Sequence, residues 1–515
     1  MRKFLNKFFF SKISMTLFSA LAAILVLFDY AYRFSNVFID NVVFNGFSFL
    51  LFILMIVNAV TMFILSALRM KHLNIYYKKG FRAVSIISFV YMIFSIALII
   101  GQFIIGGDEN LQLFSLMCLE AFPVWAAVTG ILYLLIIVPN MSSAREKKFV
   151  SVVTTACLVF VTYISLFPIT PYKFTSGPAV FDNGQEYSVV FSTNDKGTAY
   201  LSYEYNGKSV TIYDENNGRK YGDSRIHTIS VPYEQLSGNT YTVGSTRVID
   251  ELSYGGRSGK TIVSEPIKFN DNLGDNINLL TISDWHTHLK LAKRSVSYLG
   301  EYNAILLLGD AAPGLMFPKE VETNIVEFAG DLSGGTMPIL FARGNHETRG
   351  KEAVNLAGYL GMDKFYYMTS LGNYNFIVLD SGEDKEDSHP EYGGMVAYEQ
   401  NRENMVDWLE TLENADNKKT IAVSHSDEIC IEKDLSDTAY KKLDSLNSSI
   451  LLSGHHHSTE YKTDKEFPVL VDGGSNANGS GTFVASMVNL SQSGIDIKCV
   501  DSNGKVILTE TAEWK

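Results

Sequence analysis

Five short apolar runs in the second half of the chain each lead into polar residues that can bind metal. The runs cover 279–283, 304–308, 338–341, 420–423 and 449–452, and they lead into Asp284-Trp285-His286, Gly309-Asp310, Gly344-Asn345-His346-Glu347, Ser424-His425 and Gly454-His455-His456-His457. Apolar runs of this length are typical of buried strands. Because ligands of open α/β sheets gather at the carboxyl ends of the strands, we expect these five ends to meet at one pole.

The residue types at these ends indicate a metal centre. Aspartate, asparagine and histidine supply oxygen and nitrogen donors without a thiolate, a set that suits manganese, iron or zinc. Eight of the ten histidines lie between His286 and His457, although histidine is not a favoured core residue. Two cations that share a carboxylate can clamp a phosphate ester and activate water. A site for phosphate ester hydrolysis is therefore expected.

Taken in order, the motifs D-x-H, G-D, G-N-H-E, H and G-H-x-H resemble the calcineurin-like metallophosphoesterase family, which includes the purple acid phosphatases. The resemblance covers about the last half of the chain and implies an α/β/β/α sandwich over 275–515 with a dinuclear centre of divalent or trivalent ions. It implies a catalytic His346 that faces the substrate, with Glu347 orienting His346 or its loop. The implied ligands are Asp284, His286 and His457 for the first cation, Asn345, His425 and His455 for the second, and Asp310 as the bridge.

The sequence also departs from the relatives that it resembles. Pro313 falls where purple acid phosphatases have the tyrosine that gives their ferric colour, so that colour is not expected. The Asp-Arg pair of the protein phosphatases is absent too; Arg343 is a candidate substitute for its arginine, and a plain surface arginine is the alternative. His288, His389 and His456 have no ligand role in this scheme.

The first third of the chain has the character of a multi-span α-helical membrane region, 1–170. Five apolar segments are long enough to cross a bilayer, at 13–32, 42–68, 83–106, 111–138 and 149–169. Basic residues gather at the N-terminus and in alternate connections. By the positive-inside rule, the N-terminus is cytoplasmic and the fifth span leads to the extracytoplasmic side. We expect a multi-pass plasma-membrane protein. Glu120, in the fourth span, is read as interfacial, and a transport role is the alternative.

The net charge of −12 hides an asymmetry between the two parts of the chain. Residues 1–170 are net positive, so the remainder is more acidic than the total indicates. An acidic soluble part argues against nucleic acid as a partner. No C-x-x-C pattern occurs, and a Cys430–Cys499 disulfide stays open.

Between these parts, 171–274 has short strand-like runs separated by Asn, Gly and Asp turns, which predicts a small all-β sandwich. It looks like the fibronectin-type domain that precedes the catalytic domain in purple acid phosphatases.

The expected function is that of a membrane-anchored phosphohydrolase that cleaves phosphomonoesters through a metal-bridged hydroxide. One alternative is a phosphodiesterase that acts on lipid-linked or cell-envelope phosphodiesters. Another is a non-catalytic, metal-bound sensor or scaffold fused to membrane spans.

Overall fold

The computed structural model describes residues 144–145, 148, 152, 171–251, 256–414 and 418–515. The chain divides into two compact units. Every candidate site residue lies in the second unit, which comprises Tyr172–Arg247 and Lys260–Lys515. Four of the expected membrane spans, with Glu120, lie outside the described residues, and the fifth shares only Val152 with them. Over the part that is described, no helix has the length and apolarity that crossing a bilayer requires. The spans therefore stay a prediction.

The larger sheet of the second unit has ten strands, which combine a parallel centre with antiparallel flanks. The parallel neighbours are β11 (Ile277–Ile282), β12 (Ala304–Leu307), β13 (Pro338–Phe341) and β1 (Ala179–Asp182). Antiparallel strands extend both sides: β21 (Phe483–Ser491), β22 (Gly494–Asp501), β23 (Val506–Ala512) and the short β20 (Gly474–Ser475) on one, and β2 (Tyr187–Ser192) and β7 (Ile226–Val231) on the other.

The smaller sheet has six strands, ordered β14-β15-β16-β17-β19-β18. Its parallel strands are β15 (Tyr374–Leu379), β16 (Lys419–Ser424), β17 (Ser448–Ser453) and β19 (Val469–Val471), and its antiparallel edges are β14 (Tyr367–Leu371) and β18 (Glu460–Lys462). Leu306 and Leu340 of the larger sheet share one buried core with Phe376 and Val423 of this sheet. The two sheets therefore pack face to face.

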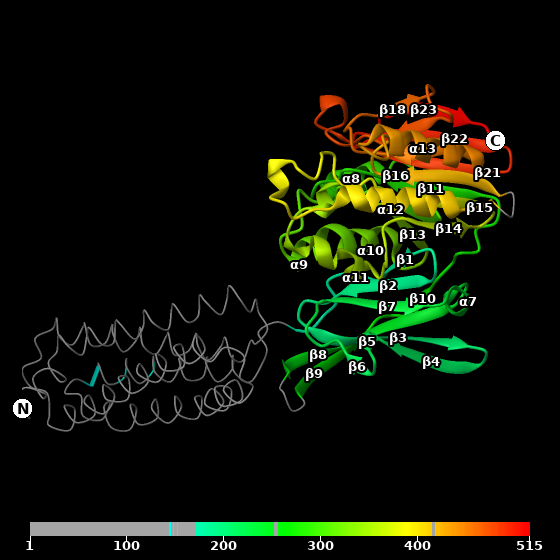
Figure 1. Cartoon of the computed structure of the whole chain (residues 1–515). Helices are drawn as coiled ribbons and strands as arrows, with labels where there is room; N and C mark the ends of the chain where they lie inside the picture. The colour runs from blue at the N-terminus through cyan, green and yellow to red at the C-terminus, as the bar shows by residue number, and fades with distance from the viewer. Residues whose placement is uncertain (1–143, 146–147, 149–151, 153–170, 252–255, 415–417) are drawn as a thin grey trace, which may run out of the picture. The chain divides into compact units, whose positions relative to one another are not determined.

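Helices cover the outer face of each sheet (Figure 1). Those on the larger sheet are α8 (Leu289–Val296), α9 (Pro318–Val321), the π-helical η3 (Glu322–Glu327), α10 (Phe328–Ser333) and α11 (Leu356–Leu360), and those on the smaller sheet are α12 (Tyr398–Thr411) and α13 (Lys433–Ser445). Strand β12 shows why its sequence is apolar throughout: Leu306 faces the other sheet, while Ile305 and Leu307 face the helices. The expected α/β/β/α sandwich is observed, and its larger sheet also includes strands from before residue 275.

The segment 171–274 is layered as a sandwich, but one of its layers, formed by β1, β2 and β7, belongs to the ten-stranded sheet. A separate sheet contains β3 (Gly197–Tyr205), β4 (Lys208–Tyr213), β8 (Thr240–Glu251), β9 (Gly256–Val263) and β10 (Ile267–Lys268). Its core faces Val180, Val189 and Phe191 of β1 and β2. Figure 1 shows β2 and β7 between this sheet and the helices of the catalytic part. Minor elements are β5 (Glu215–Asn216), β6 (Arg219–Lys220) and α7 (Tyr233–Leu236).

This arrangement differs from a separate domain that ends at 274. Strand β1 pairs in parallel with β13, with Val180 opposite Pro338 and Phe181 opposite Ile339. Without β1, the strand β13 would lie at an edge of the sheet with unpaired backbone groups, so the pairing extends the ten-stranded sheet beyond β13. Pairing between strands so far apart in sequence leaves no periodic signal in either strand.

Candidate metal centre

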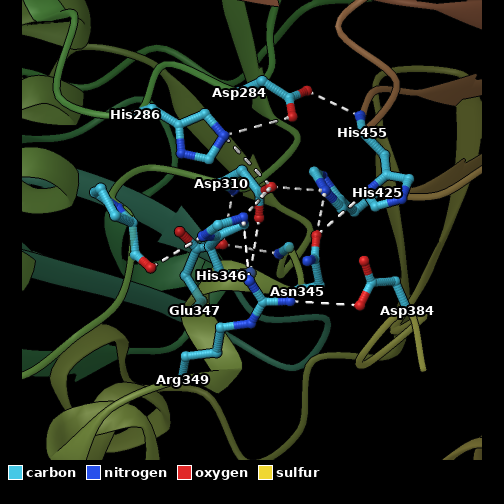
Figure 2. A network of polar contacts seen from close by, with 12 residues as sticks. Asp284, His286, Asp310, Asn345, His346, Glu347, Arg349, Asp384, His425 and His455 are labelled. Atoms are coloured by element: carbon cyan, nitrogen blue, oxygen red, sulfur yellow. Dashed lines mark hydrogen bonds and ion pairs between the residues drawn. The ribbon is translucent and has the colours of Figure 1, made fainter. Parts of the chain in front are cut away.

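The residues predicted to bind metal meet at the carboxyl ends of the strands. Asp284 follows β11, Asp310 follows β12, Asn345 follows β13 and His425 follows β16. Two further histidines, His455 and His457, follow β17. Figure 2 shows Asp284, His286, Asn345, His425 and His455 around Asp310; the remaining predicted ligand, His457, is placed by its contact with Asp284. The expectation that the five strand ends form one pole is therefore met.

The backbone is left-handed at most of these positions. The φ angle is 49° at Asp284, 34° at His286, 58° at Asp310, 71° at His455 and 47° at His457. Such φ values are uncommon for residues other than glycine and cluster at functional sites. Each turns the chain sharply after its strand, which directs the side chain across the pole.

Glycines allow the loops to approach one another. Gly309 has a φ of 87°, and a Cβ there would collide with the backbone nitrogen of Gly344. A Cβ on Gly344 would collide with the carboxylate of Asp310. These contacts give a physical reason for glycine in both G-D and G-N-H-E.

The first group of donors is Asp284, His286 and His457, whose ligand atoms all lie within 4.8 Å of one another. Oδ1 of Asp284 lies 3.6 Å from Nε2 of His457 and 3.9 Å from Nε2 of His286. Nδ1 of His457 lies 2.7 Å from the carbonyl oxygen of Ser475. This carbonyl accepts the Nδ1 proton, which leaves the Nε2 lone pair facing Asp284.

The second group is Asp310, His425 and His455, with Asn345 beside them. Nδ1 of His425 lies 2.6 Å from the carbonyl oxygen of Leu308 and donates to it. Nε2 of His425 then faces Oδ2 of Asp310 at 3.3 Å. Oδ1 of Asn345 lies 3.2 Å from both His425 Nε2 and His455 Nδ1.

Both groups fit a cation, because acceptor atoms face acceptor atoms. The buried Oδ1 of Asp284 has no hydrogen-bond partner although two imidazole nitrogens face it. Oδ1 of Asn345 likewise faces only acceptors; with its amide reversed, the nitrogen would donate to Asp310, His425 and His455. With Oδ1 of Asn345 facing His425 and His455, a cation among these atoms would give each of them a partner, because an amide binds metal through its oxygen.

Asp310 belongs to both predicted sites. Its Oδ2 lies 3.3 Å from His425 of the second group and 3.7 Å from His286 of the first. Burial opposes its charge, but the facing histidines, His425 above all, hold the pKa of Asp310 below its usual value. Burial likewise opposes the charge on His425, but the carboxylate of Asp310 raises the pKa of His425 to about 10.

His346 lies at the rim of the pole, half-buried. Its Nδ1 lies 3.0 Å from the carbonyl oxygen of Pro313, and its Nε2 faces Oδ2 of Asp310 at 3.9 Å. His346, His286 and Asp310 form a third group with metal-binding distances. Geometry therefore allows His346 either to bind a cation or to contact the substrate, and the second role stays a prediction.

Glu347 fixes the loops rather than the ring of His346. Its carboxylate accepts from the backbone N–H groups of Asp310 at 2.7 Å, Ala311 at 2.6 Å and Gly344 at 2.9 Å. Burial, with the nearby Asp310 charge, raises the pKa of Glu347 to about 7, and the N–H donors oppose that rise. Of the two roles expected for Glu347, orientation of the loop is the one observed.

Arg343 is not the substrate-facing arginine that the sequence left open. It is buried and forms a forked ion pair with Asp380, at 3.1 Å from Nε and 2.6 Å from Nη2. Its guanidinium also lies over the ring of Phe365. The arginine at the site is Arg349, whose Nη1 lies 3.3 Å from His346 Nε2. Sequence reasoning missed Arg349, although it stands only two residues after the G-N-H-E motif.

The remaining candidates lie outside both groups, as expected. His456 Nε2 pairs with Asp427 at 2.6 Å, and His389 accepts from the backbone N–H of Glu391. His288 is exposed at the start of α8. The Cys430–Cys499 disulfide does not form, because the two thiols are buried in different cores.

Comparison with known proteins agrees with this geometry. Residues 277–459 match the family described as calcineurin-like phosphoesterase. No curated protein matches the sequence. Among solved structures, the chain is similar to a purple acid phosphatase from yellow lupin seeds (13% identity, 65% of this chain, 73% of that chain, TM-score 0.44). It is also similar to a dimetal phosphatase from Danio rerio (16% identity, 46% of this chain, 99% of that chain, TM-score 0.36). Both TM-scores lie below 0.5, so neither likeness bears on function. The match to the calcineurin-like phosphoesterase family therefore covers the part of the chain that holds all seven predicted ligands.

Proposed function

We propose that this protein is a membrane-anchored, metal-dependent phosphomonoesterase. The observation that carries the proposal is the pair of donor groups that share Asp310 at one pole of a calcineurin-like phosphoesterase domain. One cation would be held by Asp284, His286, His457 and Asp310, and the other by Asp310, Asn345, His425 and His455. When bound, the two cations would neutralise phosphoryl charge and lower the pKa of bound water. The donor set suits manganese, iron or zinc.

His346 is the proposed catalytic residue. Its Nδ1–H is engaged by the carbonyl oxygen of Pro313, so the nitrogen that can exchange a proton with the substrate is Nε2. That nitrogen points to the pole, where it can protonate the departing alkoxide. A positioned acid of this kind contributes about 10²–10⁴-fold to a rate.

A phosphodiester with an apolar part is the second candidate substrate. Within the described residues, the most exposed large apolar side chains are Val354 (86%), Met395 (85%) and Phe317 (66%). Phe317 directly precedes α9, and Val354 lies in a short 3-10 helix, Lys351–Asn355. Backbone hydrogen bonds from Leu315 to Arg349 and from Glu352 to Leu315 join the two segments, and Arg349 contacts His346. Exposed apolar groups beside a site favour a substrate with a hydrocarbon portion.

The test is hydrolysis by the full-length chain, loaded in turn with manganese, iron or zinc. A generic aryl phosphomonoester and its diester serve as substrates, with Asp310→Asn and His346→Ala as variants. We expect the parent to prefer the monoester and both variants to lose activity. Preference for the diester would select the second candidate. A folded, metal-loaded parent that cleaves neither ester would instead favour a sensor or scaffold.

The cellular position is a separate part of the proposal. It follows from the five predicted spans and the charges of their connections, which put the catalytic part on the extracytoplasmic side. The test is labelling of Asn217→Cys, in an exposed turn, with a membrane-impermeant thiol reagent on intact cells. Labelling only after lysis would reverse the assignment.

A further inference from the structure

Arg349 lies against two residues of the candidate site. Its Nη1 is 3.3 Å from Nε2 of His346, and its Nη2 is 3.0 Å from one end of the Asn345 amide. Figure 2 shows the guanidinium below Asn345 and His346, with Asp384 on its far side. The side chain is 30% exposed, so it is neither buried in the core nor free in solvent.

A buried carboxylate fixes the direction of this guanidinium. Glu383 accepts from Nε and from Nη2 of Arg349, both at 2.8 Å, in a forked pair. Glu383 in turn accepts from the hydroxyls of Thr348 at 2.7 Å and Tyr392 at 3.0 Å. Forked pairs of this kind fix the guanidinium plane as well as its distance. The remaining nitrogen, Nη1, therefore faces His346.

The guanidinium of Arg349 has more N–H donors than its protein partners use. An arginine has five N–H groups. Glu383 takes two and Asp384 takes one at 3.4 Å, and Nη1 can donate one to Nε2 of His346 only while that nitrogen carries no proton. In the described part of the chain, the second hydrogen of Nη1 meets no acceptor. Nη2 could also donate to an Asn345 oxygen, but that oxygen turns away if it binds a cation.

We propose that Arg349 donates a hydrogen bond to a phosphoryl oxygen of the bound substrate. The assignment rests on the proposed function, because it requires a phosphate ester at the pole. The charge of Arg349 is already balanced by Glu383, so its contribution is a donor of fixed direction. A terminal phosphate presents more free oxygens to such a donor than a diester does.

A purely structural role is the competing explanation, in which Arg349 only holds the segment 380–384 in place. Arg343 supplies the matched control, because it forms a similar fork on Asp380 of that segment and has no contact with either donor group among the described residues. Lysine at either position keeps the charge but cannot form the fork. The two substitutions loosen the same segment, and only one removes a donor from the site.

The experiment measures binding of inorganic phosphate to the manganese-loaded full-length chain by calorimetry, for the parent, Arg349→Lys and Arg343→Lys. A separate titration measures manganese affinity. Loss of a charge-assisted hydrogen bond predicts that Arg349→Lys weakens phosphate binding by about tenfold or more. Manganese affinity stays at the parental value. Phosphate binding by Arg343→Lys also stays close to that of the parent.

Three results would overturn the assignment. If Arg349→Lys binds phosphate as tightly as the parent does, Arg349 does not contact the substrate, and the proposed function still stands. Equal losses in both lysine variants would show that the segment, and not the donor, matters. A parent that neither binds phosphate nor cleaves an ester would end the proposed function and this assignment together. If Arg349→Lys does not fold, Glu383→Gln takes its place: it loosens the guanidinium, and unchanged phosphate affinity would contradict the proposal.

Discussion

The two donor groups of the pole differ in depth. In the second group, His425 is fully buried, Asp310 and Asn345 are almost so, and only His455 is half-buried. In the first group, the side chain of His457 is 39% exposed, although its partner Asp284 is buried. The deep group is held by the core before any cation arrives, whereas the outer group is completed by loop residues at the surface. We therefore expect the deep site to retain its cation and the outer site to exchange it.

The largest effect is expected where the two groups meet. Asp310→Asn removes the carboxylate shared by both sites, so it should lower turnover by more than the about 10²–10⁴-fold assigned to the acid His346. It should also lower bound manganese below two per chain, measured by elemental analysis. Parental turnover in Asp310→Asn would show that the groups do not act as one centre.

A pair of alanine substitutions separates the deep group from the outer one. His425→Ala leaves the carbonyl of Leu308 without its donor in the core, which should cost about 1–3 kcal/mol of unfolding free energy in chelator. His457→Ala should lose metal with little change in stability, because its imidazole is near solvent. Thermal unfolding in the presence of a chelator measures the change in stability, and elemental analysis measures the loss of metal. Equal destabilisation by the two substitutions would contradict the difference in depth.

Two histidines, His425 of the second group and His286 of the first, should respond to pH in opposite directions in the metal-free protein. The Asp310 carboxylate raises the pKa of His425 to about 10 in spite of burial, so this pairing stabilises the fold fully below pH 6.5 and is lost as pH rises through about 10. Burial lowers the pKa of His286, so its contribution is present at higher pH and is lost on acidification.

Chelated protein should accordingly become less stable from pH 7 to 10. The measurement is urea unfolding across that range, with His425→Gln as the comparison, which should flatten the decline. If His425→Gln loses stability between pH 7 and 10 as steeply as the parent does, the decline does not come from the pair of His425 and Asp310.

The smallest effect is expected at the histidine between two predicted ligands. His456 pairs with Asp427 and has no contact with either donor group among the described residues. His456→Ala should leave two cations per chain and cost no more than about 1 kcal/mol, since the pair is partly exposed. Loss of a cation would show that His456 belongs to the centre.

The pole was predictable because its signals are local. An apolar run marks a strand buried on both faces, and the residue after it lies at the sheet end where ligands gather. The same reasoning could not choose between Arg343 and Arg349, because loop geometry decides which carboxylate each side chain meets. Nor could it place β1 beside β13, because strand pairing across a long separation has no local signature.

Anomalous diffraction from crystals of the manganese-loaded chain tests the central claim most directly. Two peaks are predicted, one among Asp284, His286 and His457 and one among Asn345, His425 and His455, with Asp310 between them. A single peak, or peaks away from Asp310, would contradict the shared centre.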